Sequence, residues 1–128
     1  MKTVKNTHII KSFIIIGLIM GILDYIYLSS ISNMFKKMLY RIQSSNLSLK
    51  LVPTILCYIF LIFSILYFII IKNGNILDAF ILGISIYAVY ELTNYATIDS
   101  WSLELVLIDT IWGGILFSLT TFLHNKIV

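Results

Sequence analysis

Three carboxylates lie inside segments that are otherwise apolar enough to cross a membrane: Asp24, Glu91 and Asp109. An ionisable side chain in hydrocarbon is costly, and such residues commonly mark proton relays, cation sites or substrate pathways. No Lys or Arg lies at the same depth, so the three acids cannot all stay charged in a dry interior. At least one of them must carry a proton or be neutralised by a bound cation. These residues therefore predict proton or cation chemistry.

The acids are expected to share one leaflet of the membrane. Glu91 and Asp109 lie at similar distances on either side of the turn at 99–102, about 12 to 14 Å along their helices. Asp24 lies near the end of its segment that faces the same side. Each acid has small or hydrogen-bonding neighbours at helical spacing. The candidate polar site comprises Asp24, Tyr90, Glu91, Thr93, Asn94, Thr97, Asp109 and Trp112.

The composition predicts that these residues are held by membrane helices. The chain has 128 residues, of which 59% are hydrophobic and 12% charged, and its mean hydropathy is +0.98. Windows of about 20 apolar residues, the length that crosses about 30 Å of hydrocarbon, occur at 9–28, 51–71, 76–98 and 103–123. We therefore predict an all-α integral membrane bundle of four transmembrane helices, forming a single domain over residues 1–128 in a lipid bilayer.

The small residues and the cations have predicted places in this bundle. Gly17, Gly21, Gly83 and Gly113 are expected to let helices approach closely. Residues 34–42 have an apolar arc opposite Lys36, Lys37 and Arg41, which predicts a short amphipathic helix between the first two spans. It either lies at the membrane surface or caps the bundle. Trp101 is expected in the aromatic belt at the membrane interface.

The net charge of +3 does not indicate nucleic-acid binding, because the cations lie at helix ends, where they meet headgroups and water. The positive-inside comparison between the two sides is close to a tie. The turn at 99–102 has no cation, which favours termini in the cytoplasm.

Several functions are compatible with an acidic membrane site. The preferred hypothesis is proton- or cation-linked handling of a small polar ligand, and a transport function would favour a homodimer. No cofactor is expected apart from a divalent cation with oxygen ligands, such as Mg²⁺, Ca²⁺ or Mn²⁺, held by Asp24, Glu91 and Asp109. The alternatives are a structural or assembly subunit whose polar residues only pack helices, and a lipid-modifying or lipid-binding protein.

Nucleophilic catalysis has little support, and the sequence leans away from an enzyme. His8 and His124 lie near the chain ends and are expected at the membrane interface. The serines of the spans, Ser12 among them, are expected to have no intramembrane His partner. There is also no Gly-x-Ser-x-Gly motif.

Four polar motifs carry a family resemblance. They are Asp24-Tyr25-Ile26-Tyr27-Leu28, the run from Tyr90 to Thr97, Trp101, and Asp109-Thr110-Ile111-Trp112-Gly113. This ordered set resembles the predicted membrane proteins grouped as domain of unknown function 2177, over nearly the whole chain. Tyr27 stands where that family usually has Trp, and Glu91 where it usually has Asp. The resemblance implies a four-helix integral membrane protein with no established activity.

Overall fold

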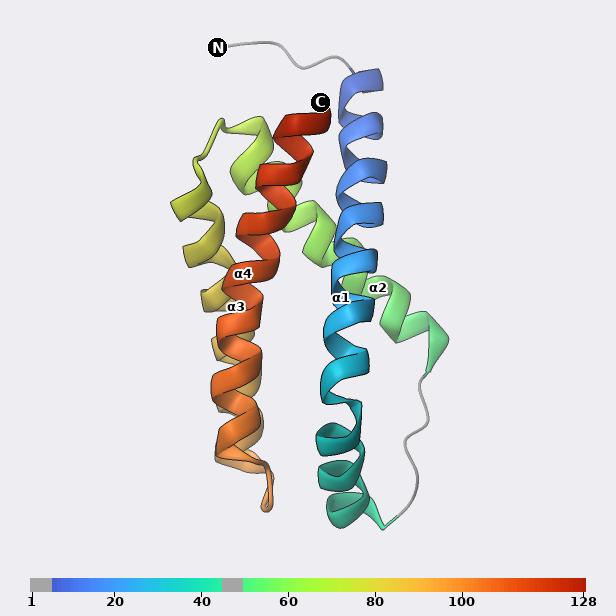
Figure 1. Ribbon diagram of the computed structural model, residues 1–128, viewed down its shortest axis with the longest axis vertical. Coiled ribbons are helices and arrows are strands. Elements are labelled where there is room, and N and C mark those ends of the chain that lie inside the picture. The colour runs from blue at the N-terminus through green and yellow to red at the C-terminus, as the bar shows by residue number, and fades with distance from the viewer. Residues whose placement is uncertain (1–5, 45–49) are drawn as a thin grey trace.

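The computed structural model describes residues 6–44 and 50–128, and this part of the chain is a helical bundle (Figure 1). Its elements are α1 (Asn6–Gln43), α2 (Leu51–Ile65), a π-helix η1 (Leu66–Ile71), α3 (Ile76–Thr97) and α4 (Leu103–Ile127). The candidate spans found within these residues are Thr7–Gln43, Leu51–Ile71, Ile76–Thr97 and Leu103–Ile127. The prediction of an all-α membrane bundle with four spanning helices is confirmed.

The first helix differs from the prediction in one respect. Residues 34–42 are helical, but they continue α1 and form no separate helix. Neither Gly nor Pro lies between Gly21 and Pro53 to interrupt it. The Ser29 and Ser30 hydroxyls donate to backbone carbonyl oxygens one turn back, at 2.8 and 3.0 Å, and leave the helix intact.

The C-terminal part of α1 packs lengthwise on the bundle. Its apolar arc includes Met38, which is fully buried against Trp101, Leu105 and Val106 at the α3–α4 end. The 38 residues of α1 extend for about 57 Å, well beyond the hydrocarbon thickness of about 30 Å. The segment thus caps the α3–α4 turn, which was the second of the two predicted arrangements. Lys36, Lys37 and Arg41 are exposed on its outer side.

Helices α3 and α4 form a close antiparallel pair and lie side by side in Figure 1. The contact is closest at Gly83, where an added Cβ would collide with the Gly113 carbonyl oxygen and lie 2.9 Å from Phe117 Cβ. Elsewhere, Gly17 packs near Ile62 of α2, at 3.1 Å from an added Cβ, whereas Gly21 has nothing within 4 Å. Among these predicted packing glycines, Gly83 and Gly113 let two helix backbones meet.

Side-chain caps determine where both helices of this pair begin. Asn75 accepts a hydrogen bond from the Asp78 backbone N–H at 2.8 Å, and the Asp78 carboxylate accepts from the Asn75 N–H at 2.9 Å. This reciprocal capping box starts α3. The Ser102 hydroxyl accepts from the Leu105 N–H at 3.2 Å and starts α4.

The connections divide the bundle into two ends. The start of α1, the end of α4 and the α2–α3 turn lie at one end in Figure 1, and the α3–α4 turn and the end of α1 lie at the other. Asp24, Glu91 and Asp109 belong to the part between them. The fold therefore supplies an interior polar region and a separate helix-end region, which differ in chemistry.

Candidate functional site

Asp24 lies where three helices meet. Its side chain on α1 is buried, with 6% exposed. One carboxylate oxygen accepts a hydrogen bond from the Tyr58 hydroxyl of α2, and the other accepts from the Trp112 indole N–H of α4 at 3.0 Å. Both oxygens are thus bound by neutral donors from neighbouring helices.

Tyr27 links this acid to the second one. It follows Asp24 by three positions on α1, so the two side chains share a helix face. Its ring stacks on Trp112, with centroids 4.5 Å apart and planes 6° from parallel, and its hydroxyl donates to Asp109 at 2.8 Å. Asp24 and Asp109 are therefore connected through a stacked aromatic pair.

Glu91 is the most deeply buried of the three acids, with 2% exposed. The Trp101 indole N–H reaches back from the α3–α4 turn and donates to Glu91 at 2.9 Å. The Glu91 carboxyl group also lies close enough to Asp109 for the two groups to interact. Two neighbouring carboxylates in a membrane interior repel each other strongly, which favours a proton on one of them.

These contacts form one connected set, which we name the acidic network. It consists of Asp24, Tyr27, Tyr58, Glu91, Trp101, Asp109 and Trp112. The Tyr hydroxyls and Trp indole N–H groups that donate to these acids carry no charge. In the described residues, no three His, Cys, Asp or Glu side chains gather in a way that would hold a metal ion. These uncharged donors do not balance the negative charge of the acids.

The order of these motifs along the chain matches a known family. A family model described as Predicted membrane protein (DUF2177) matches residues 9–124. The chain belongs to this family. No curated protein and no solved structure matches it. Together with the spanning helices, membership makes this DUF2177 protein a multi-pass integral membrane protein.

The structure separates the predicted polar site of this DUF2177 protein into two sets. Asp24, Glu91, Asp109 and Trp112 come together in the acidic network. The other four, Tyr90, Thr93, Asn94 and Thr97, lie outside it. Tyr90, Thr93 and Thr97 lie about 100° or more around α3 from the inward-facing Glu91, which directs them outward. Asn94 is only about 60° away and is half-buried.

Hydrogen bonds within α3 satisfy part of this outer set. Tyr90 is 54% exposed and Asn94 is half-buried. Thr93 and Thr97 are exposed, and the Thr97 hydroxyl donates to the Thr93 carbonyl oxygen at 2.7 Å. These residues present a polar stripe on the outer face of α3.

Three members of the network in this DUF2177 protein were not predicted as site residues. Tyr27 could have been found, because it lies three positions from Asp24. Tyr58 could not, since nothing in the sequence gives the rotation of α2. Trp101 was expected at the membrane interface, but it is buried, with 7% exposed, and directed at Glu91.

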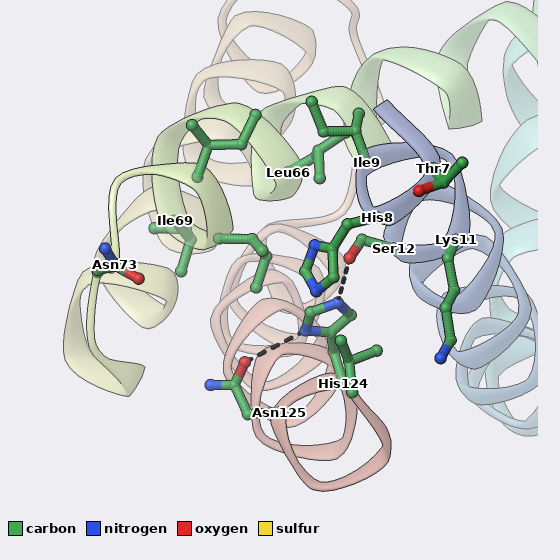
Figure 2. Close-up of a pocket in the computed structure, with 14 residues that line it drawn as sticks. Thr7, His8, Ile9, Lys11, Ser12, Leu66, Ile69, Asn73, His124 and Asn125 are labelled. Atoms are coloured by element: carbon green, nitrogen blue, oxygen red, sulfur yellow. Dashed lines mark hydrogen bonds between the residues drawn. The ribbon is translucent and has the colours of Figure 1, made fainter. Parts of the chain in front are cut away.

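A second polar cluster corrects the prediction that Ser12 has no His partner. His124 Nε2 lies 2.9 Å from the Ser12 hydroxyl, and its Nδ1 lies 3.2 Å from Asn125 Oδ1 (Figure 2). Ser12 and His124 are buried, whereas His8 is exposed. The pair lies at the helix ends, on opposite termini of the chain, and lines a cavity of about 860 Å³.

Proposed function

We propose that this DUF2177 protein is a proton-linked membrane protein in which the Glu91–Asp109 pair takes up and releases a proton while a small polar ligand or cation is handled. The observation that carries the proposal is the close approach of two carboxyl groups, Glu91 buried and Asp109 half-buried, whose Trp and Tyr donors are uncharged. Repulsion between two carboxylates in a membrane interior favours a proton on one of them. Intramembrane acids of proton relays meet the same requirement.

The surroundings of the pair support coupling to a positive charge. Both acids also accept hydrogen bonds from aromatic side chains, Trp101 to Glu91 and Tyr27 to Asp109. These donors stabilise negative charge but do not neutralise it. Loss of the shared proton would leave two negative charges in contact in a medium of low dielectric constant, which is strongly unfavourable. Proton release therefore favours the arrival of a cation or a cationic ligand in its place.

Infrared spectroscopy tests for the shared proton. The protein in lipid nanodiscs near neutral pH should show the carbonyl band of a protonated carboxylic acid, and Glu91→Gln or Asp109→Asn should abolish it. Each substitution removes the partner that the proton was shared with. Glu104→Gln is the matched control, since Glu104 is an exposed acid in the first turn of α4. An unchanged band in both network variants, or no band in the wild type, would refute the proposal.

Coupling to a ligand is tested in proteoliposomes. A trapped pH-sensitive dye should report proton movement when Na⁺, K⁺, Mg²⁺, Ca²⁺ or Mn²⁺ is added outside. The response should be lost in Glu91→Gln and retained in Glu104→Gln. Equal responses in both variants would show that the proton movement does not depend on Glu91, and would contradict its coupling to the ligand.

The transport form of this proposal requires a homodimer, because four spans are few to enclose a path. The polar stripe on α3 supplies a suitable face, since hydroxyl side chains bond across helices in membranes. Thr93→Cys in a Cys57→Ser background should then form a disulfide between copies under oxidation. Ser85→Cys is the control for non-specific collision, because Ser85 is also exposed but lies nearer the start of α3. Failure to cross-link in a native-like bilayer would count against transport.

We also propose termini in the cytoplasm. The support is the lack of a cation in the turn at 99–102. Ser100→Cys in the Cys57→Ser background should react with an impermeant thiol reagent added to the outside of intact cells. Labelling only after the cells are opened would show that the turn at 99–102 lies in the cytoplasm, and that the termini lie on the opposite side.

A structural subunit is the second candidate. The observation favouring it is that Asp24 binds donors from α2 and α4, so the acidic network ties neighbouring helices together. The Glu91→Gln, Asp109→Asn double variant distinguishes the two functions. A raised thermal midpoint would indicate acids retained for function at a cost in stability, and a lowered midpoint would indicate acids that hold helices together.

A further inference from the structure

The cavity at the helix ends is separate from the acidic network. It lies between the first turns of α1, the π-helix η1, the turn that follows η1, and the last turn of α4 (Figure 2). Its volume of about 860 Å³ falls within the range of about 300 to 1,000 Å³ typical of ligand sites. The site that the proposed function uses contributes none of its lining residues.

The polar side of the cavity is built from basic and hydrogen-bonding side chains. Lys11 and His8 are exposed on α1, while His124 of α4 is buried, with 2% exposed. Figure 2 shows the two imidazole rings facing one another inside the cavity. Ser12 and Asn125 hold the His124 ring through both of its nitrogens, at 2.9 and 3.2 Å. The ring is therefore fixed in place before any ligand arrives.

Lys11 carries the charge of the cavity lining, and the nearby Asp78 carboxylate, behind Gly74, accepts a hydrogen bond from the Asn75 N–H. Among the described residues that line it, none is Asp or Glu. Two other cations at this end have aromatic partners instead, with Lys72 Nζ lying 4.8 Å from the Tyr67 ring and Lys126 Nζ 5.5 Å from the Phe122 ring. Lys11 is the lysine that lines the cavity itself. An anion is the ligand that this lining favours.

The opposite wall is apolar. The π-helix contributes Leu66, Ile69, Ile70 and Ile71, and α1 adds Ile9. Short π-helical turns occur often at functional sites. A fully polar anion would leave this wall in contact with water, whereas an amphiphile would cover it with its apolar part.

We propose that this cavity binds an anionic phospholipid, with its phosphate group beside Lys11, His8 and His124 and the start of its acyl chains against η1. The cavity lies at the ends of spanning helices, where headgroups lie, and basic pockets between such helices bind lipid headgroups elsewhere. The proposed orientation places it in the cytoplasmic leaflet, which is the leaflet richer in anionic lipid.

Native mass spectrometry of the detergent-solubilised protein tests this proposal. The probes are phosphatidylglycerol, zwitterionic phosphatidylcholine and inorganic phosphate, each added separately. The test variant is His8→Gln with Lys11→Gln, because both side chains are exposed and their loss leaves the fold intact. The control is Lys36→Gln with Lys37→Gln, which removes exposed charge from the other end of α1. A second variant, His124→Gln, probes the buried wall.

The wild type should retain phosphatidylglycerol in preference to phosphatidylcholine. Retention should fall about fivefold or more in the His8→Gln, Lys11→Gln variant, the effect of losing a surface cation or two, and less than about twofold in the lysine control. Equal losses in test variant and control would show general charge attraction and overturn the site. Equal retention of both lipids would overturn the role of the charge. Binding of inorganic phosphate without phosphatidylglycerol would make the ligand a free anion and overturn the lipid.

Discussion

The acidic network and the helix-end cavity use hydrogen bonding in opposite ways. In the network, the acids bind indole and phenol donors from neighbouring helices, and the glycine contact beside it leaves no space between α3 and α4. In the cavity, His124 is held firmly, but Lys11 and His8 face open space. The comparison teaches that the acids of the network and the basic side chains of the cavity lie at different depths along the helices. A closed region suits a proton, and an open basic region suits a larger anion.

Removal of Asp24 should have the largest effect, because its carboxylate accepts hydrogen bonds from two other helices. Asp24→Ala would take this acceptor away from the Tyr58 hydroxyl and the Trp112 indole N–H, which are both half-buried. Each unsatisfied donor costs about 1 to 3 kcal/mol, so we expect a loss of about 2 to 6 kcal/mol in the free energy of unfolding. Denaturant unfolding in mixed micelles measures this loss of free energy.

A double-mutant cycle checks the cause. In a Tyr58→Phe background, Asp24→Ala should cost less than in the wild type, since one of the two orphaned donors is already gone. Equal costs in both backgrounds would contradict a role for the Tyr58–Asp24 bond and would weaken the description of the network as closed.

A smaller effect is expected from filling space next to the network. Gly113→Ala adds a Cβ that would overlap the Tyr87 ring, so α3 and α4 would have to separate. Overpacking of this kind costs about 1 to 3 kcal/mol. The matched control is Gly21→Ala, which meets nothing within 4 Å and should be neutral or stabilising by about 1 kcal/mol through helix propensity. The thermal midpoint should fall in Gly113→Ala and should stay the same or rise in Gly21→Ala. An equal drop in both would remove the steric explanation.

The sequence predicted which elements form, because each depends on local properties. Apolar windows of spanning length became the described helices, and the motifs led to the family that the model match confirms. Counting residues from the turn at 99–102 was enough to predict that Glu91 and Asp109 lie at one depth, and the structure places them close enough to interact. Depth along a helix follows from the rise per residue alone.

The features that the sequence did not predict depend on helix rotation and on contacts between distant segments. Tyr90, Thr93, Asn94 and Thr97 were predicted to join the site with Glu91. The direction of Glu91 turns most of them outward. The predicted separation between the span at 9–28 and the short helix at 34–42 did not occur, because serine hydroxyls can bond within a helix. Ser12 and His124 are 112 positions apart, and no periodicity links residues at that separation.

The smallest stability effect is expected in the open region. Ser12→Ala removes one hydrogen bond from His124 Nε2, which lies beside a cavity where water can take the place of the lost hydroxyl. We expect a loss of at most about 1 kcal/mol in the free energy of unfolding. Retention of phosphatidylglycerol should nevertheless fall, because the imidazole would no longer be held toward the ligand. The control is Ser64→Ala, since the Ser64 hydroxyl bonds only within α2, to the Phe60 carbonyl oxygen at 2.8 Å. A Ser12→Ala variant as unstable as Asp24→Ala would show that the helix-end region is as closed as the acidic network, and the contrast between the two regions would fail.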